Sequence, residues 1–412
     1  MEKMMNWFSE KLAPPLVKFT QMRVIAAILT GFMKVMPFLL VGAMFQIVSD
    51  IVLIIAPKST IPWDVMTNLT FGLLSIALSY TIAAAMAERH KVNPLSAGLL
   101  SISVFLILTK PDFSNGGFLV ADFGRLGAAG LFVAILGALF TGEVMGQFMK
   151  RGWTIGGKGL PDFVAEWFAP LIPGLIVVLV AWLVAYVANI DLHTILAVLI
   201  TPVLKATDSY FGFLFIAILI TAVFVIGINP SIFFGVLFPL WMAAVGENAA
   251  LVAHGLAPVH INTIQTFIGW VVIGGTGAPL SLCILMLFSK SKTIKALSRV
   301  AIVPSLMNIS EPLLFGLPIA FNPILAIPFI INGALLNPTM VWLAMHFDLV
   351  TKPFNPAVIP WLPVGITGFI FNQDWRGIVL VVILIVLNGL IWSPFLKAYE
   401  KIMIAKEQPE AA

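Results

Sequence analysis

The chain has 412 residues, of which 60% are apolar and only 10% are charged, and its formal net charge is +4. A soluble globular chain carries roughly a quarter charged residues, so this composition excludes a soluble fold and indicates an integral membrane protein. The cations are spread over loop ends, which excludes a nucleic-acid-binding protein. The single cysteine, Cys283, excludes a disulfide framework. We also expect no metal and no cofactor.

The apolar residues come in blocks close to the ~20 residues with which a helix crosses a bilayer, so we predict an all-α polytopic membrane protein. The first 23 residues mix apolar and charged groups and predict an amphipathic helix on the cytoplasmic surface. Spans follow at 24–48, 68–88, 94–109, 127–148, 168–189, 209–228, 262–288, 318–345 and 377–396. Three further apolar segments stay open, 192–204 because it is short, and 229–258 and 353–372 because prolines interrupt them. We expect about ten transmembrane helices.

Lysine and arginine gather in a few short loops. The clusters are Arg89 with Lys91; Lys150, Arg151 and Lys158; Lys290, Lys292, Lys295 and Arg299; and Lys397, Lys401 and Lys406. Loops rich in these residues remain in the cytoplasm, so we expect both termini on the cytoplasmic side. The cluster at 290–299 has a second interpretation, because four cations in ten residues could also dock an acidic partner protein.

Helix-breaking residues concentrate in the second half of the chain, where Asn-Pro occurs at 229–230, 322–323, 337–338 and 355–356. A proline inside the bilayer frees a carbonyl, and broken helices near the midplane are typical of transport sites. We therefore predict an N-terminal membrane domain that forms dimers, 1–205, and a C-terminal substrate-binding domain with re-entrant hairpins, 206–400. A cytoplasmic tail, 401–412, follows. Proline kinks that only shape helix packing are the alternative.

Glu311 is the only formally charged residue in 301–346. An ionisable group inside a membrane costs several kcal/mol unless it is paired, hydrated or turned into a cavity, so Glu311 is a functional candidate. Pro312 and Gly316 favour a re-entrant hairpin around it. A carboxylate accepts two hydroxyl hydrogen bonds side by side, which suits a sugar. The alternative is a structural carboxylate that caps a broken helix or pairs with a cation such as Arg299.

A glycine-rich segment, Gly274-Gly275-Thr276-Gly277-Ala278-Pro279, lies within an apolar span. Glycine places nothing in the way, so a second backbone or a substrate can approach closely. Close helix packing and a substrate path both remain open for this segment. It is not a phosphate-binding P-loop, because the required Lys followed by Ser or Thr is absent.

A series of short motifs runs through the second half. They are Gly227-Ile228-Asn229-Pro230, Gly274-Gly275-Thr276-Gly277-Ala278, Asn308-Ile309-Ser310-Glu311-Pro312, Phe315-Gly316-Leu317-Pro318, Asn322-Pro323, Ile327-Pro328-Phe329, Val358-Ile359-Pro360-Trp361 and Trp375-Arg376-Gly377. With the N-terminal start, this order resembles the lactose and cellobiose family of enzyme IIC permeases of the phosphotransferase system, over nearly the whole chain.

The resemblance implies a homodimeric sugar permease in the bacterial cytoplasmic membrane. Its substrate would be a β-linked disaccharide such as cellobiose, chitobiose or lactose. A separate phosphorylated enzyme IIB, supplied by enzyme IIA, would phosphorylate the hydroxyl on carbon six. We expect no independent catalysis by this chain.

The resemblance also implies the sugar-binding residues. Glu311 matches the acid of the family's Asn-Ile-Asn-Glu-Pro signature, with Ser310 in place of the usual Asn, and would orient or deprotonate the sugar hydroxyl. Asn229 stands where the family commonly has the histidine of Gly-Ile-His-Gly, and its amide cannot take a proton at neutral pH. The expected set is Phe224, Asn229, Gly275, Thr276, Asn308, Ser310, Glu311 and Trp361, with His254 or His260 as a replacement for the missing histidine. Phe224 and Trp361 would stack on the sugar ring, with core packing as their alternative.

Two other classes of function remain open. An ion-coupled secondary sugar transporter uses the same broken helices and an intramembrane carboxylate, and needs no phosphorylated partner. A membrane enzyme that acts on lipid-linked substrates would need a cluster of acids or histidines at the surface, and the sequence offers none.

Overall fold

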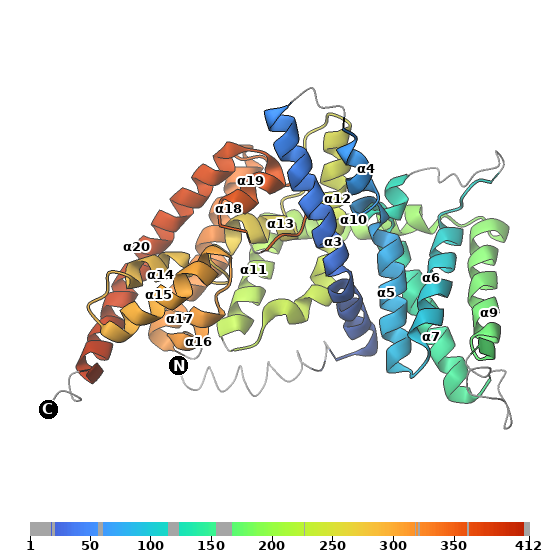
Figure 1. The fold of residues 1–412 in the computed structure, drawn as a ribbon, viewed down its shortest axis with the longest axis horizontal. Helices are drawn as coiled ribbons and strands as arrows, with labels where there is room; N and C mark the ends of the chain where they lie inside the picture. The colour runs from blue at the N-terminus through green and yellow to red at the C-terminus, as the bar shows by residue number, and fades with distance from the viewer. Residues whose placement is uncertain are drawn as a thin grey trace. The chain divides into compact units, whose positions relative to one another are not determined.

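A computed structural model describes residues 18, 21–56, 61–113, 123–153, 167–225, 227–317, 319, 322–360 and 362–407. Within these ranges every regular element is a helix (Figure 1). The chain divides into two compact units, one formed by Lys18–Val203 with Phe234–Ala250 and the other by 204–233 with 251–407. Most of the amphipathic helix predicted for the first 23 residues lies outside the described residues.

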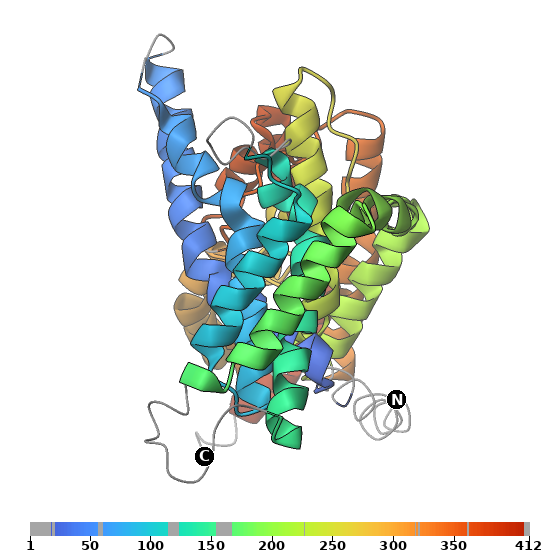
Figure 2. The ribbon, with the colours of Figure 1, turned by 90° about the vertical axis from the view of Figure 1, so that its right-hand side faces the viewer.

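The first unit is a bundle of helices packed around α5. Its elements are α3 (Arg23–Ile55), α4 (Trp63–Asn68), η2 (Phe71–Leu73), α5 (Leu74–Arg89), α6 (Pro94–Leu108), η3 (Phe123–Leu126), η4 (Ala128–Gly130), α7 (Leu131–Arg151), α9 (Leu171–Trp182), the π-helical turn η5 (Leu183–Val187), most of α10 (Leu192–Asp208) and most of α12 (Phe234–Ala253). Helices α3, α6 and α7 all contact α5 (Figures 1 and 2). Glycines permit this packing, because a Cβ at Gly31 would lie 2.3 Å from the Ile82 side chain and one at Gly142 would lie 2.6 Å from Met86.

Segment 192–204 does not continue the preceding span. The axis of Leu192–Asp208 is bent by 87° from that of Leu171–Val187. Asp191 lies at the bend, where its Oδ1 accepts a hydrogen bond from the backbone N–H of His193 (3.0 Å) and its Oδ2 lies 2.9 Å from Nη2 of Arg125. The side chain of Asp191 thus starts a new helix instead of prolonging the old one.

The second unit contains the broken helices. Its elements are α11 (Tyr210–Val225), η6 (Pro230–Phe233), α13 (Ile264–Thr266), the π-helical turn η7 (Phe267–Val271), α14 (Leu280–Met286), α15 (Lys292–Leu306), α16 (Glu311–Gly316), α17 (Pro323–Ile330), the π-helical turn η8 (Ile331–Leu336), α18 (Asn337–His346), α19 (Ile366–Asn372) and α20 (Trp375–Glu407). Helix α11 runs antiparallel to the α17–η8–α18 helix. The Tyr210 ring lies 5.4 Å from that of Trp342 at one end, and the Phe224 ring lies 6.3 Å from that of Phe329 at the other.

One predicted span is interrupted, and one of the segments that the sequence left open is largely helical. The prediction of one span over 262–288 is wrong, because α13 and η7 end at Val271 and α14 begins only at Leu280. Segment 229–258, which prolines made ambiguous, contains a 20-residue helix that accommodates Pro239 in its interior.

By length and composition, five described helices are long and apolar enough to cross a membrane, and the bent pair would make six. Two shorter apolar helices, Pro94–Leu108 and Tyr210–Val225, accompany them, so these helices leave the predicted number of ten crossings undecided.

Asp374 holds the start of the long C-terminal helix. Its carboxylate accepts hydrogen bonds from the backbone N–H and the hydroxyl of Thr351 (both 2.9 Å) and lies 2.8 Å from Nη2 of Arg376. Burial alone would raise the pKa of Asp374, but the hydrogen bonds from Arg376 and Thr351 outweigh it and lower the pKa to about 2.

We therefore expect Asp374→Asn to destabilise the protein by about 2 kcal/mol at pH 7. Because the pKa in the folded state lies below the unfolded value of about 3.9, the stabilisation is complete only above about pH 5 and is lost progressively as the pH falls toward 2. Thermal unfolding of both proteins in detergent at pH 7 and pH 2.5 measures this difference. A difference that stays constant over this range would contradict the assignment.

Candidate functional site

The glycine segment breaks the helix that begins at Ile264. Gly274, Gly275 and Gly277 have φ angles of 83°, 106° and 81°, in the region that L residues avoid, and Ala278 follows with φ 52°. The glycine loop, residues 272–279, therefore leaves the helical path between η7 and α14. Thr276 is half-buried, whereas its glycine neighbours are buried.

Side chains from distant segments satisfy the backbone groups that the break leaves without helical partners. Asn308 Nδ2 donates to the carbonyl of Ile268 (3.1 Å), and Asn308 Oδ1 accepts from the backbone N–H of Gly274 (2.8 Å). Asn337 Nδ2 donates to the carbonyl of Val271 (2.9 Å). A single amide, that of Asn308, thus joins η7 and the glycine loop to the segment that carries Glu311.

The glycine loop and the Glu311 segment touch directly. A Cβ at Gly275 would lie 2.4 Å from Cβ of Ser310 and 2.9 Å from its backbone nitrogen. On the other side of the loop, a Cβ at Gly277 would lie 2.2 Å from the Phe329 ring, and one at Gly333 would lie 2.7 Å from Cα of Gly277. The loop is therefore packed so closely that only glycine fits at these positions.

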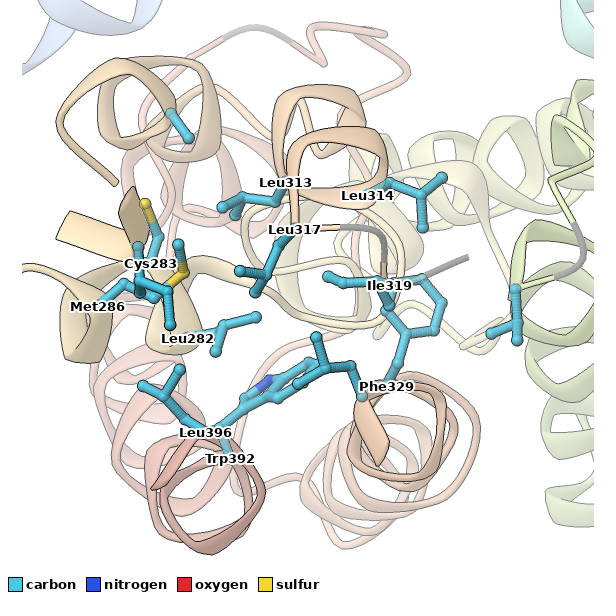
Figure 3. Packing of buried hydrophobic residues seen from close by; sticks show 14 of the residues in the cluster. Leu282, Cys283, Met286, Leu313, Leu314, Leu317, Ile319, Phe329, Trp392 and Leu396 are labelled. Atoms are coloured by element: carbon cyan, nitrogen blue, oxygen red, sulfur yellow. The ribbon is translucent and has the colours of Figure 1, made fainter. Parts of the chain in front are cut away.

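Glu311 begins the short helix α16 with its side chain exposed. The helix is anchored by its apolar side, because Leu313 and Leu314 are fully buried in the hydrophobic core that also contains Phe329 and Trp392 (Figure 3). Among the described residues no cation lies within ion-pair distance of Glu311, so the alternative of a pair with Arg299 is not observed.

Phe224 lies in the last turn of α11, and Asn229 follows the end of that helix. Asn229 is exposed, and its Oδ1 accepts a hydrogen bond from the backbone N–H of Ser231 (2.9 Å), so it caps the turn η6. Phe224 is only 4% exposed and packs in the core. A sugar would reach the Asn229 amide more readily than the Phe224 ring.

The histidines occupy other places. His260 pairs through Nδ1 with Asp208, at the start of α11, while the core around α16 packs at the end of α11. Helix α11 has 16 residues, so the two sites are separated by about 24 Å along it. His254 is exposed in the turn that follows α12. These positions do not favour either histidine as a replacement for the one that Asn229 displaces, and Trp361 lies outside the described residues.

Sequence reasoning therefore assembled five residues that the structure brings together: Gly275, Thr276, Asn308, Ser310 and Glu311. It missed the residues that support them. Trp270 Nε1 donates to the carbonyl of Gly377 (2.9 Å), and Trp392 Nε1 donates to that of Ala278 (3.3 Å). The Asn-Pro dipeptide at 337–338 drew attention to Asn337, because it predicts a break in the helix that contains it. It did not reveal that the amide of Asn337 binds the carbonyl of Val271 in another helix.

No group of three or more His, Cys, Asp or Glu side chains in the described ranges could hold a metal ion.

The chain is similar to known proteins along its whole length. Residues 29–333 match the family described as "Phosphotransferase system, EIIC". The cellobiose-specific EIIC component of Geobacillus stearothermophilus is 30% identical, over 100% of this chain and 97% of that protein. The lactose-specific EIICB component of Staphylococcus haemolyticus is 29% identical, over 99% of this chain and 72% of that protein. The crystal structure of ChbC, the IIC component of the N,N'-diacetylchitobiose-specific phosphotransferase system, matches with a TM-score of 0.88 and 28% identity, over 98% of this chain and 99% of that one.

The close contact at Gly275 predicts a difference between two glycine substitutions. Gly255 also has a positive φ, 73°, but a Cβ there would meet nothing within 4 Å. We expect Gly255→Ala to cost about 1–2 kcal/mol of backbone strain. Gly275→Ala adds the collision with Ser310, about 1–3 kcal/mol more, and should lower sugar affinity as well. Thermal unfolding in detergent compares them, and equal losses of stability would show that the loop does not press against Ser310.

Proposed function

This chain belongs to the phosphotransferase-system EIIC family and is a membrane sugar permease, and we propose that it carries a β-linked disaccharide past Glu311 and the glycine loop. Cellobiose, chitobiose and lactose are the sugars we propose as candidates. Similar proteins bear these specificities in their names, and the likeness to them covers almost the whole chain.

One observation carries the proposal. The segment that carries the exposed carboxylate of Glu311 touches, through Ser310, a backbone segment that has no side chain at Gly275, and Asn308 ties the two segments together. A carboxylate accepts hydrogen bonds from two neighbouring hydroxyls, and a side-chain-free backbone lets a pyranose ring approach. We propose that Thr276 and Asn229 supply further polar contacts to the sugar.

We further propose that transport ends in phosphorylation by a separate enzyme IIB, which enzyme IIA recharges. The sugar hydroxyl on carbon six attacks the phosphorus of the phosphocysteine of enzyme IIB, so an O–P bond forms as the S–P bond breaks. Glu311 orients this hydroxyl or accepts its proton. The phosphorylated sugar no longer fits the site and remains in the cell. The lactose-specific relative, whose name joins IIC to IIB, supports this partnership.

The proposed setting is the bacterial cytoplasmic membrane, with both termini in the cytoplasm and two copies of the chain in a dimer. The hydrogen bonds from Ser289 to Glu400 and from Ser291 to Glu407 support the cytoplasmic placement of the C-terminal end. They bring two clusters of cations, at 290–299 and at 397–406, to the same end of the second unit, as the retention of positive charge in the cytoplasm requires.

We expect Glu311→Gln to reduce sugar affinity roughly 10- to 150-fold, because it removes charge-assisted hydrogen bonds worth about 1.5–3 kcal/mol. The measurement is phosphoenolpyruvate-dependent uptake of labelled β-disaccharides and monosaccharides into vesicles, with and without the soluble phosphotransferase proteins. Asp348→Asn, which removes an exposed carboxylate remote from the loop in sequence, is the matched control.

Two results would count against the proposal. Accumulation of unmodified sugar on an ion gradient alone would replace it with a secondary transporter. Uptake of sugar phosphate that is unaffected by Glu311→Gln would move the binding site elsewhere in the chain.

A further inference from the structure

Three asparagines lie inside the second unit with amide atoms that no group of the described chain binds. Asn332 and Asn337 belong to the α17–η8–α18 helix, Asn388 belongs to α20, and all three are fully buried. Both amide atoms of Asn332 and of Asn388, and Oδ1 of Asn337, have no hydrogen-bond partner among the described residues. A buried amide without a partner is costly to a fold of small net stability, so these atoms call for one.

The two helices that carry these asparagines run antiparallel. At one end of the pair, Nη1 of Arg376 in the first turn of α20 donates to the carbonyl of Asp348 (3.4 Å), just beyond the end of α18. Toward the other end, Phe329 of α17 and Trp392 of α20 belong to one hydrophobic core cluster (Figure 3). Two contact points far apart fix the directions of both helices.

Asn332 and Asn388 lie at the same level of this antiparallel pair. The path along the helix from Asn332 to its end at His346 is about 20 Å, and so is the path from the start of α20 at Trp375 to Asn388. Elements η8 and α20 are in contact. The two amides with no partner on either atom therefore come from neighbouring helices at one depth.

Both amides lie next to one end of the glycine loop. Gly333 follows the first of them in the chain, and a Cβ there would lie 2.7 Å from Cα of Gly277. Trp392 lies one helical turn after the second, and its Nε1 donates to the carbonyl of Ala278 (3.3 Å). Gly277 is itself buried, and its N–H and C=O have no partner in the part of the chain that the structure describes. Polar atoms from three segments thus gather on the side of the loop away from Ser310.

The chemistry of these atoms selects the ligand. Asn332 and Asn388 each offer an N–H donor and a carbonyl acceptor, and so does the backbone of Gly277. A metal cation would bind the oxygens and leave the N–H groups unbound, and an anion would do the reverse. A neutral molecule with O–H groups satisfies both kinds of atom. Because both side chains are 0% exposed, that molecule must be small, which excludes a sugar.

We propose that Asn332 and Asn388 bind water molecules that also bond to the backbone of Gly277. A buried water makes about three hydrogen bonds to polar groups that lack other partners, and these three residues supply more than that number. Inside a membrane protein, ordered water is one of the partners that can satisfy a backbone freed by a helix break. This water supports the glycine loop from behind, and the inference does not depend on which substrate the chain carries.

The test is X-ray footprinting of the full chain in detergent with no sugar present. The radiation converts bound water into hydroxyl radicals, which oxidise the side chains next to it, and mass spectrometry locates the oxidised residues. Trp392 is the reporter, because it is 0% exposed and lies one turn from Asn388. Trp241, 1% exposed in the first unit, is the internal control. We expect oxidation of Trp392 and none of Trp241, a comparison that needs no variant.

Two substitutions test the asparagines themselves. Asn388→Leu and Asn332→Leu replace an amide by an apolar side chain of similar size, and each should abolish the oxidation of Trp392. Val386→Leu, at an exposed position of the same helix, is the matched control and should leave that oxidation unchanged. Asn332→Leu serves alone if Asn388→Leu does not fold.

Three results would overturn the proposal. If Trp392 is oxidised no more than Trp241, the amides bind groups of the chain and not water. If both leucine variants keep the oxidation of Trp392, the water lies elsewhere. Thermal unfolding of the native chain in sodium chloride and in choline chloride at equal ionic strength gives the third, because a stability that requires sodium would assign the site to a cation.

Discussion

Inside a bilayer, a backbone carbonyl that loses its helical partner must find another donor within the protein, and the second unit is organised around this requirement. The helix from Ile264 stops at the glycine loop, and the amides of Asn308 and Asn337 bind carbonyls near its end. Asn308 comes from the break between α15 and α16, whereas Asn337 lies within the continuous helix Ile324–His346. Removing either amide would leave a carbonyl in η7 unsatisfied.

The same arrangement explains why Glu311 faces outward. A charged group on an isolated helix in lipid would turn toward water or a partner. Here the two leucines that follow, Leu313 and Leu314, are buried in the core, and Ser310 presses on Gly275, so the start of α16 has little freedom. Apolar packing on one side and the contact of Ser310 with Gly275 on the other fix the segment from which the exposed carboxylate of Glu311 extends.

Much of this could be predicted from the sequence, and the remainder depends on contacts that no local pattern reveals. Composition established the helical membrane class, and the Asn-Pro and glycine motifs located the broken segments. The continuity of 262–288 was misjudged, because its high apolar content hid the positive φ angles of the glycines. The pairing of Trp270 with Gly377, 107 residues apart, required the folded chain. The apolar sequence around Phe224 does not distinguish a stacking surface from a core position, and the fold buries it.

The most direct test is to locate the bound sugar. A photoreactive β-disaccharide would be cross-linked to the purified chain and the labelled peptides identified by mass spectrometry, with excess unlabelled sugar as the competitor. The account predicts competed labelling within 272–279 and 308–317, the two segments that Asn308 joins. Competed labelling confined to the first unit would show that the broken helices serve only packing, and would contradict the account.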